Sequence, residues 1–182
     1  MEITSIHKPR IVVIGSCNTD MVVKANRLPV PGETILGGTF YMNPGGKGAN
    51  QAIAASRLGA EVTFISKIGY DLFGLQALEI YKSERINTDF IFTDQKNPSG
   101  VALISVDSFG ENSIIVAPGA SRSLSIEDIN KAEEKVKEAD IILMQLEIPI
   151  DTVEYAATIA CKYGKKVILN PAPASSLSNS FL

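Results

Sequence analysis

A glycine-rich turn at residues 44–50, Pro-Gly-Gly-Lys-Gly-Ala-Asn, contains residue types that suit a charged or polar ligand. Its glycines allow a ligand to approach the backbone, and a helix that begins here would direct its first N–H groups and positive dipole end at an anion. Lys47 and Asn50 add side-chain donors on the first turn of that helix. The same residues also suit a tight strand-to-helix turn that binds nothing, so both interpretations stay open.

Polar residues lie at the ends of three predicted buried strands: Asn18 and Asp20 follow the first, Glu147 follows a later one, and Asn170 ends the last. In open α/β sheets, ligands bind beyond the carboxyl ends of the strands, where these residues would lie. Short polar side chains accept from and donate to vicinal hydroxyls, as recognition of a sugar requires. Each position also has an ordinary structural interpretation: an Asx-turn at 18–20, a solvated loop at Glu147 and a rigid strand exit at 170–173.

The composition argues against several other kinds of site. The chain has 182 residues, of which 45% are hydrophobic and 20% charged, and its formal net charge is −3. That charge argues against binding to nucleic acid or to an anionic membrane, which needs a concentrated basic face. His7, the single histidine, lies in the polar N-terminal tail, so neither a histidine metal site nor a Ser/His/Asp triad is expected. The usual P-loop, G-x-x-x-x-G-K-[ST], does not occur in the sequence.

The start of the chain and its cysteines favour a cytoplasmic protein. The segment MEITSIHKPR lacks the apolar core of a signal peptide, and the longest apolar runs are too short to cross a bilayer. Cys17 and Cys161 are too few for a disulfide framework, so we expect both to be reduced thiols.

Alternating strand and helix signals position the candidate residues. Continuous β-branched runs predict buried strands, while three- and four-residue apolar spacing predicts helices between them. Asp71, Ser125 and Asp151 are predicted to open three of the helices. The predicted strands span residues 10–16, 62–68, 90–93, 140–145 and 166–170, and the predicted helices span 48–58, 71–85, 125–138 and 151–164. This alternation predicts a three-layer α/β fold, in which a largely parallel sheet has helices on both faces.

Two stretches, 20–43 and 99–117, break this alternation. They contain short strand signals at 21–24, 34–41, 101–107 and 112–116, and the last two flank a hairpin turn that contains Gly110. We expect them to form a small antiparallel sheet that projects from the main one. The tail after Ala174 completes no further element, so we expect the chain to stop before the domain is finished.

Several of these motifs together resemble one family of enzymes. The string GGKGANQA, followed at fixed spacing by Gly59 and Gly69, resembles the N-terminal signature of the ribokinase family of sugar and nucleoside kinases. The strings GSCNTD, PVPGE, SGVALI, MQLE and NPAPA resemble the ribose branch of that family. The resemblance spans nearly the whole chain.

The resemblance implies a sugar site at the residues described above. Asn18 and Asp20 would bind sugar hydroxyls, the glycine-rich turn would hold the ribose, and Glu147 would complete the pocket. The implied substrate-binding residues are Asn18, Asp20, Gly46, Lys47, Gly48, Asn50 and Glu147. Gly45 and Gly46 would be the hinge of a β-sheet lid built from 20–43 and 99–117, which in this family also makes the homodimer contact.

The second half of the family's machinery has no counterpart in the sequence. In the family, a glycine-rich anion hole ends in the catalytic Asp, and no G-[AG]-G-D string occurs between Met1 and Leu182. The resemblance implies ATP, Mg²⁺ and a monovalent cation (K⁺) as cofactors, with sites mostly outside this chain. We therefore expect residues 1–182 to be the N-terminal portion of a single α/β domain, with no catalytic residue and no metal ligand of its own.

The expected activity belongs to the complete protein: ATP and D-ribose give D-ribose 5-phosphate. A kinase for deoxyribose or for another small sugar or nucleoside is an alternative. A non-catalytic module for sugar binding or dimerisation is a third interpretation. We expect the 182-residue chain alone to be inactive and to associate through an open sheet edge, because phosphoryl transfer needs a base, a phosphate cradle and a metal.

Overall fold

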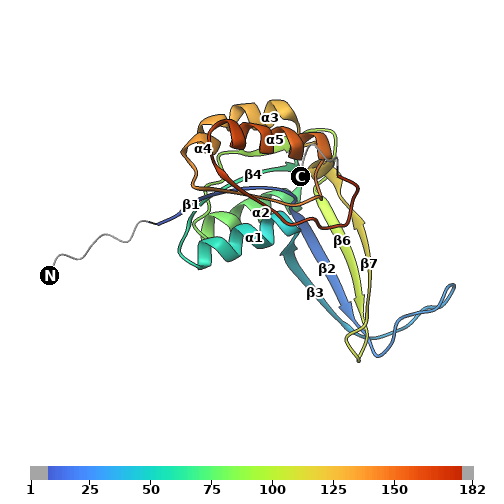
Figure 1. The fold of residues 1–182 in the computed structure, drawn as a ribbon. Coiled ribbons are helices and arrows are strands. Elements are labelled where there is room, and N and C mark those ends of the chain that lie inside the picture. Colours follow the sequence, from blue (N-terminus) through green and yellow to red (C-terminus); the bar gives the residue numbers. More distant parts are fainter. Residues whose placement is uncertain (1–7, 178–182) are drawn as a thin grey trace.

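Two β-sheets organise residues 8–177, the part of the chain that the computed structural model describes (Figure 1). The larger sheet is entirely parallel, with the strand order β5-β4-β1-β8-β9. Its strands are β1 Arg10–Ile14, β4 Glu61–Gly69, β5 Ile91–Asp94, β8 Ile141–Met144 and β9 Lys166–Leu169. Because β1 lies in the middle, residues that follow it lie at the centre of the sheet's carboxyl edge.

Helices cover both faces of the larger sheet, and each face has its own hydrophobic core. Figure 1 shows α1 Lys47–Arg57 and α2 Leu72–Ser83 on one face, and α3 Ile126–Lys131, α4 Glu133–Glu138 and α5 Ile150–Lys162 on the other. Alternate residues of β1 point to opposite cores: Val12 and Ile14 pack under α3–α5, and Val13 packs under α1 and α2. The predicted three-layer α/β fold is confirmed.

The smaller sheet projects from the carboxyl edge of the larger one (Figure 1). Its strand order is β3-β2-β6-β7, with β2 Asn18–Lys24, β3 Thr39–Gly45, β6 Gly100–Val106 and β7 Asn112–Ala117. The outer pairs are antiparallel as predicted, whereas the central pair β2–β6 is parallel. The sheet is therefore mixed, because β2 and β6 each follow a strand of the parallel sheet and leave its edge in the same direction.

Two strands of the smaller sheet differ from their predicted ranges. β2 begins at Asn18 instead of at residue 21, and β3 does not match the predicted range of 34–41. Gly37 and Gly38 have φ of 105° and 102°, a conformation that interrupts a strand, so β3 begins only at Thr39. The strand then continues through Pro44 to Gly45, residues that the sequence assigned to a turn. Proline is tolerated there because β3 is an edge strand and Pro44 needs no N–H for the ladder.

Two helix boundaries also differ from the prediction. The capping box of Ser125 and Asp128 is confirmed, but the helix breaks at Ala132 into α3 and α4. Ala132 is fully buried, so packing rather than local propensity sets this break. The last helix begins at Ile150 after Pro149, and Asp151 lies inside its first turn instead of capping it. Asp71 does cap α2, through Gly74 N–H at 2.9 Å.

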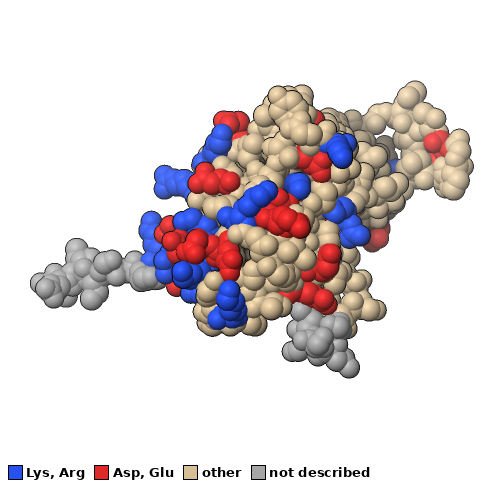
Figure 2. Space-filling model, turned by 90° about the horizontal axis from the view of Figure 1, so that it is seen from above, with Lys and Arg blue, Asp and Glu red and all other residues tan. Residues whose placement is uncertain are grey.

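Several other features bear on the sequence expectations. Both cysteines are free thiols, Cys17 buried and Cys161 exposed. None of the helices between residues 8 and 177 has the length and apolar character needed to cross a membrane. On the face covered by α3–α5, basic and acidic side chains are interspersed (Figure 2). His7 lies outside the described residues.

Candidate functional site

A cavity of about 480 Å³ lies where the carboxyl edge of the larger sheet meets the smaller sheet. The strand ends after β1 and β8, the first turn of α1, the end of β7 and the 3₁₀ turn η1 (Gly119–Ser123) all contribute to its wall. Its lining residues are Ser16, Asn18, Lys47, Val116, Pro118, Arg122, Leu146, Glu147 and Pro173. This is the position at which open α/β sheets bind ligands.

Lys47 and Glu147 form an ion pair in the wall of this cavity. Lys47 Nζ lies 2.7 Å from Glu147 Oε1, and the backbone N–H of Lys47 donates to Glu147 Oε2 at 2.9 Å. The Ser16 hydroxyl donates to the same oxygen at 2.5 Å. Burial alone would raise the pKa of the Glu147 carboxyl, but hydrogen bonds from Lys47 and Ser16 outweigh it and lower that pKa. Glu147 is therefore an anion held at the positive end of α1.

Asn18 has an unsatisfied acceptor beside the cavity. Its side chain is buried, and no donor within residues 8–177 reaches its Oδ1 atom. The amide fits only because residue 100 is glycine: a Cβ atom at Gly100 would lie 2.1 Å from Asn18 Oδ1. A buried acceptor without a donor is costly. This oxygen faces Gly100 and has almost no exposed surface, so the amide must turn toward the cavity before the oxygen accepts a hydrogen bond from a ligand.

Asp20 lies on β2, two residues beyond Asn18, and is not part of the cavity wall itself. Its carboxylate packs against Gly45, where a Cβ atom would lie 2.1 Å from Asp20 Oδ1. Burial raises the pKa of Asp20, the negative charge of Glu147 raises it further, and Lys47 opposes both. Asp20, Glu147 and Lys47 thus interact electrostatically, because β1 and β8, the strands that precede Asp20 and Glu147, are neighbours and Lys47 opens α1 beside them.

The glycines of the turn let α1 approach β1 closely. Gly46 precedes the helix with a φ of 89°, and a Cβ atom there would lie 2.9 Å from Cys17 Cα. At Gly48 a Cβ atom would lie 2.6 Å from the carbonyl oxygen of Ser16. Asn50 is exposed and does not line the cavity. The turn therefore places Lys47 at the site and does not bring Asn50 into the cavity wall.

The structure adds residues that the sequence reasoning missed. Ser16 belongs to the string GSCNTD, so its place directly after β1 was a usable signal. Arg122, Val116 and Pro118 reach the cavity from β7 and η1, which only the tertiary fold brings there. Of the strand exit 170–173, Pro173 lines the cavity and Asn170 does not.

No group of three or more His, Cys, Asp or Glu side chains suited to a metal ion occurs within residues 8–177. We therefore derive no step through a metal ion from this part of the chain.

Comparison with known proteins relates this chain to carbohydrate kinases. Residues 8–181 match the family described as pfkB family carbohydrate kinase. A ribokinase of Haemophilus influenzae is 45% identical over 172 residues, which cover 94% of this chain and 56% of that protein. A deoxyribokinase of Salmonella typhi is 41% identical over 164 residues, which cover 90% of this chain and 54% of that protein.

Solved structures give the same relationship. A ribokinase from Thermotoga maritima superposes with a TM-score of 0.84 at 33% identity, covering 96% of this chain and 56% of that one. The ribokinase of Arabidopsis thaliana, complexed with ribose and ATP, superposes with a TM-score of 0.76 at 35% identity, covering 90% of this chain and 53% of that one. The chain thus spans about half the length of these relatives.

Proposed function

Because this chain belongs to the pfkB family of carbohydrate kinases, we propose that the complete protein is a ribokinase, which converts ATP and D-ribose to ADP and D-ribose 5-phosphate. The observation that carries the proposal is the polar wall of the cavity, to which Asn18 and the Lys47–Glu147 ion pair contribute. A neutral polyhydroxylated ligand matches this wall, because its hydroxyls donate to Asn18 and Glu147 and accept from Lys47.

We assign sugar binding to the residues that the sequence pointed to. Asn18 and Asp20 accept from sugar hydroxyls, Lys47 donates, and Glu147 fixes Lys47 and accepts from a further hydroxyl. Gly46 and Gly48 let the first turn of α1 approach Cys17 and Ser16, which brings Lys47 to the sugar, and Asn50 is assigned to the sugar by its place on that same turn. The assigned residues are Asn18, Asp20, Gly46, Lys47, Gly48, Asn50 and Glu147.

The chemical step requires groups that we place in the part of the relatives that this chain does not span. Both carboxylates near the cavity, Asp20 and Glu147, are assigned to the sugar, so neither is proposed as the base. The catalytic Asp, the anion hole for the phosphoryl group, and the sites for ATP, Mg²⁺ and K⁺ would complete the active site from there. These groups would supply the base and the charge stabilisation that phosphoryl transfer needs.

We further propose that the smaller sheet is a lid that closes over the sugar, with Gly45 and Gly46 as its hinge. Gly45 ends β3 and Gly46 is the N-cap of α1, so both lie where the smaller sheet connects to that helix. Closure would exclude water from the transferring phosphoryl group, which strengthens the electrostatic interactions inside the site.

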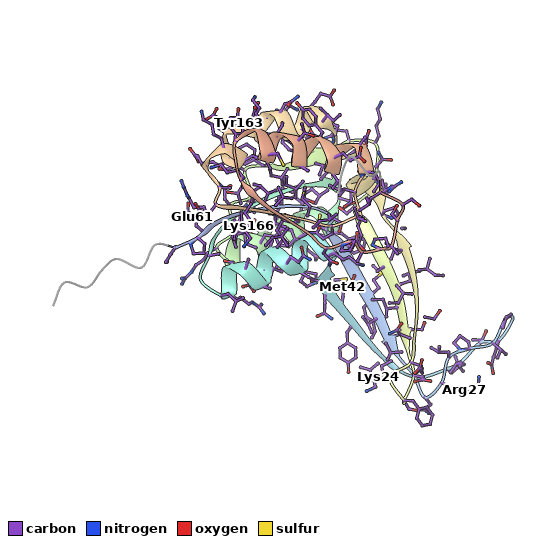
Figure 3. All side chains as sticks on the ribbon, in the orientation of Figure 1. Lys24, Arg27, Met42, Glu61, Tyr163 and Lys166 are labelled. Atoms are coloured by element: carbon purple, nitrogen blue, oxygen red, sulfur yellow. The ribbon has the colours of Figure 1, made fainter. Side chains whose placement is uncertain are left out.

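The same sheet is the proposed homodimer contact. Exposed apolar side chains of Met42, Leu103 and Ile115 form one row across it, because strand register places them beside one another through Met21. Met42 lies nearer the larger sheet than Lys24, which lies toward the outer end (Figure 3). Ile115→Asp should convert the dimer to a monomer in sedimentation velocity, and a variant that stays dimeric would contradict this contact.

A kinase assay on the complete protein with ribose, deoxyribose, fructose and adenosine tests the proposed activity. We expect the highest kcat/KM with ribose. The 41% identity to a deoxyribokinase favours deoxyribose as the second candidate, which a higher kcat/KM for that sugar would establish. Higher activity with fructose or adenosine would refute both, and sugar binding without turnover would favour a non-catalytic module. We propose the cytoplasm as the compartment, and neither a nucleic acid nor a membrane as a partner.

A further inference from the structure

Two parallel cross-links join α1 to the segment that follows β8. The first is the Lys47–Glu147 ion pair at the cavity. The second is a hydrogen bond in which Gln145 Nε2 donates to Gln51 Oε1. Lys47 and Gln51 lie four residues apart on α1 and therefore on the same side of the helix, while Gln145 and Glu147 lie two residues apart. The glutamine pair thus repeats the ion pair one helical turn farther from the site.

The Gln145 side chain is built into the fold and is not a surface contact. It is fully buried, and its Oε1 atom has no hydrogen-bond donor within residues 8–177. A Cβ atom at Gly15 would lie 2.0 Å from Gln145 Oε1 and 2.9 Å from Gly48 Cα. Glycine at position 15 therefore makes the space into which Gln145 inserts, between the end of β1 and the first turn of α1.

A half-satisfied amide in such a place has a stability cost that an apolar side chain would avoid. Buried polar pairs of this kind can fix the register between two elements. Here the register in question is that of Lys47 relative to Glu147. When a ligand binds, Lys47 or Glu147 must share its hydrogen bonds with that ligand, and the ion pair then holds the helix less firmly.

We propose that Gln51 and Gln145 are positioning residues, which hold the first turn of α1 against β8 so that Lys47 and Glu147 keep their places when sugar binds. The glutamine pair carries no charge, so its hydrogen bond persists while the ion pair exchanges partners. This proposal takes ribose as the substrate from the proposed function, and takes the positions of the two glutamines from the observed contacts.

The test compares the complete protein with its Gln51→Leu, Gln145→Leu and doubly substituted variants, and with Gln95→Leu as a control in an exposed loop. Removing one neutral hydrogen bond should raise the KM for ribose by about three- to tenfold in each single variant. The KM of the double variant for ribose should be no higher than the larger of the two single-variant values, because both substitutions remove the same bond. The KM for ATP should stay within about twofold of the unsubstituted value.

Two further measurements separate positioning from stability. The double variant replaces both partners with apolar groups, so its thermal midpoint should equal or exceed that of the unsubstituted protein. Amide hydrogen exchange over residues 47–51 should nevertheless be faster in the double variant than in the unsubstituted protein, by at least about fivefold, and the difference should be larger with ribose bound than without it. A lower thermal midpoint together with equal changes in the KM values for ribose and ATP would show that the pair only stabilises the fold, and would overturn the proposal. An unchanged rate of amide exchange would overturn it as well. If the unsubstituted protein does not phosphorylate ribose, the proposed function fails, and the exchange and midpoint results alone decide on the pair.

Discussion

Three of the polar side chains assigned to the sugar differ in how well the protein itself satisfies them. Glu147 accepts hydrogen bonds from Ser16 and from two groups of Lys47, so its charge is stabilised before any ligand arrives. Asn18 and Asp20 are in the opposite situation, since one has an orphaned oxygen and the other has a raised pKa. Residues whose polar atoms the fold leaves unsatisfied are the ones from which a ligand gains most.

Asp20→Asn should weaken the use of ribose without weakening the fold. A charge-assisted hydrogen bond to a hydroxyl contributes about 1.5–3 kcal/mol, so the KM for ribose should rise about ten- to hundredfold while the KM for ATP changes little. Because burial raises the pKa of Asp20, its charged form opposes folding at neutral pH, and the thermal midpoint of the variant should be equal or higher. Asp89→Asn, on an exposed turn, is the matched control. A destabilised variant with unchanged KM values would identify Asp20 as a turn residue only.

The lowered pKa of Glu147 should make its charged form stabilise the fold, whereas the raised pKa of Asp20 makes its charged form destabilise the fold. The folded-state pKa of Glu147 is lower than its ordinary value of 4.5, so its contribution is fully present above pH 4.5 and is lost as the pH falls through the folded-state pKa. The difference in thermal midpoint between the unsubstituted protein and Glu147→Gln should therefore be largest near neutral pH and should shrink below pH 4.5. Glu134→Gln serves as the control, because an exposed ion pair contributes little. A difference that does not depend on pH would contradict the stabilisation of the anion.

At the same scale, residue type and position predicted part of the site. Asn18, Asp20, Lys47 and Glu147 were identifiable because they follow strands or open a helix, and such positions share one edge of a parallel sheet. Arg122 had no comparable signal, since a 3₁₀ turn distant in sequence brings it to the cavity. These contacts depend on tertiary packing, which local patterns do not encode.

Among the elements, those with strong local determinants were predicted best. The buried run of β1 and the caps of α2 and α3 lie where the sequence placed them. The start of β3 and the break at Ala132 were missed, because the backbone conformation of Gly37 and Gly38 decides the first and burial decides the second. The parallel pairing of β2 with β6 was missed as well, since it follows from the direction in which two separate strands leave the larger sheet.

The base of the smaller sheet is anchored at the start of α2 by Ser99, which precedes β6. Its backbone N–H and hydroxyl both donate to Asp71 at 2.7 Å, and its hydroxyl oxygen accepts from Gly69 N–H at 3.0 Å. Ser99→Ala would leave the buried N–H of Gly69 without an acceptor, which should lower the free energy of unfolding by about 1–3 kcal/mol. Denaturant unfolding of the complete protein measures this loss.

Ser108→Ala is the control for this anchor, because its hydroxyl donates to Asn26 in an exposed loop at the far end of the same sheet. It should change the unfolding free energy by well under 1 kcal/mol. Equal effects of the two substitutions would show that Ser99 does not anchor the sheet.

At the scale of the whole molecule, the site exists because two sheets of different orientation meet. The larger sheet supplies the strand ends that carry Ser16 and Glu147, and the smaller sheet supplies Asn18 and Val116 across the cavity. Alternating strand and helix signals predicted the larger sheet, and the interruption of that alternation predicted the smaller one. Strand order could not be predicted in this way, because pairing between distant strands is decided by packing.

One edge of the larger sheet determines how a polypeptide of residues 1–182 should behave by itself. Among the described strands, β9 pairs only with β8, and Ile168 on β9 is 41% exposed. An unpaired strand edge with exposed apolar side chains promotes association, so this polypeptide should scatter light as an oligomer or aggregate. Ile168→Lys, which puts a charge on that edge, should reduce the scattering, whereas Leu58→Lys, on the distant end of α1, should not.

The same polypeptide should not phosphorylate ribose, because the base and the phosphate cradle are proposed to lie outside it. Loss of a general base alone lowers the rate by about 10²–10⁴-fold, and loss of the groups that stabilise the transferring phosphoryl lowers it further. The assay follows ATP-dependent formation of ribose 5-phosphate by residues 1–182 beside the complete protein at equal concentration. A monodisperse monomer that phosphorylates ribose would contradict both the proposed location of the base and the proposed role of the β9 edge. In that case, Asp20 and Glu147 would have to be reconsidered as catalytic residues, since they are the carboxylates nearest the cavity.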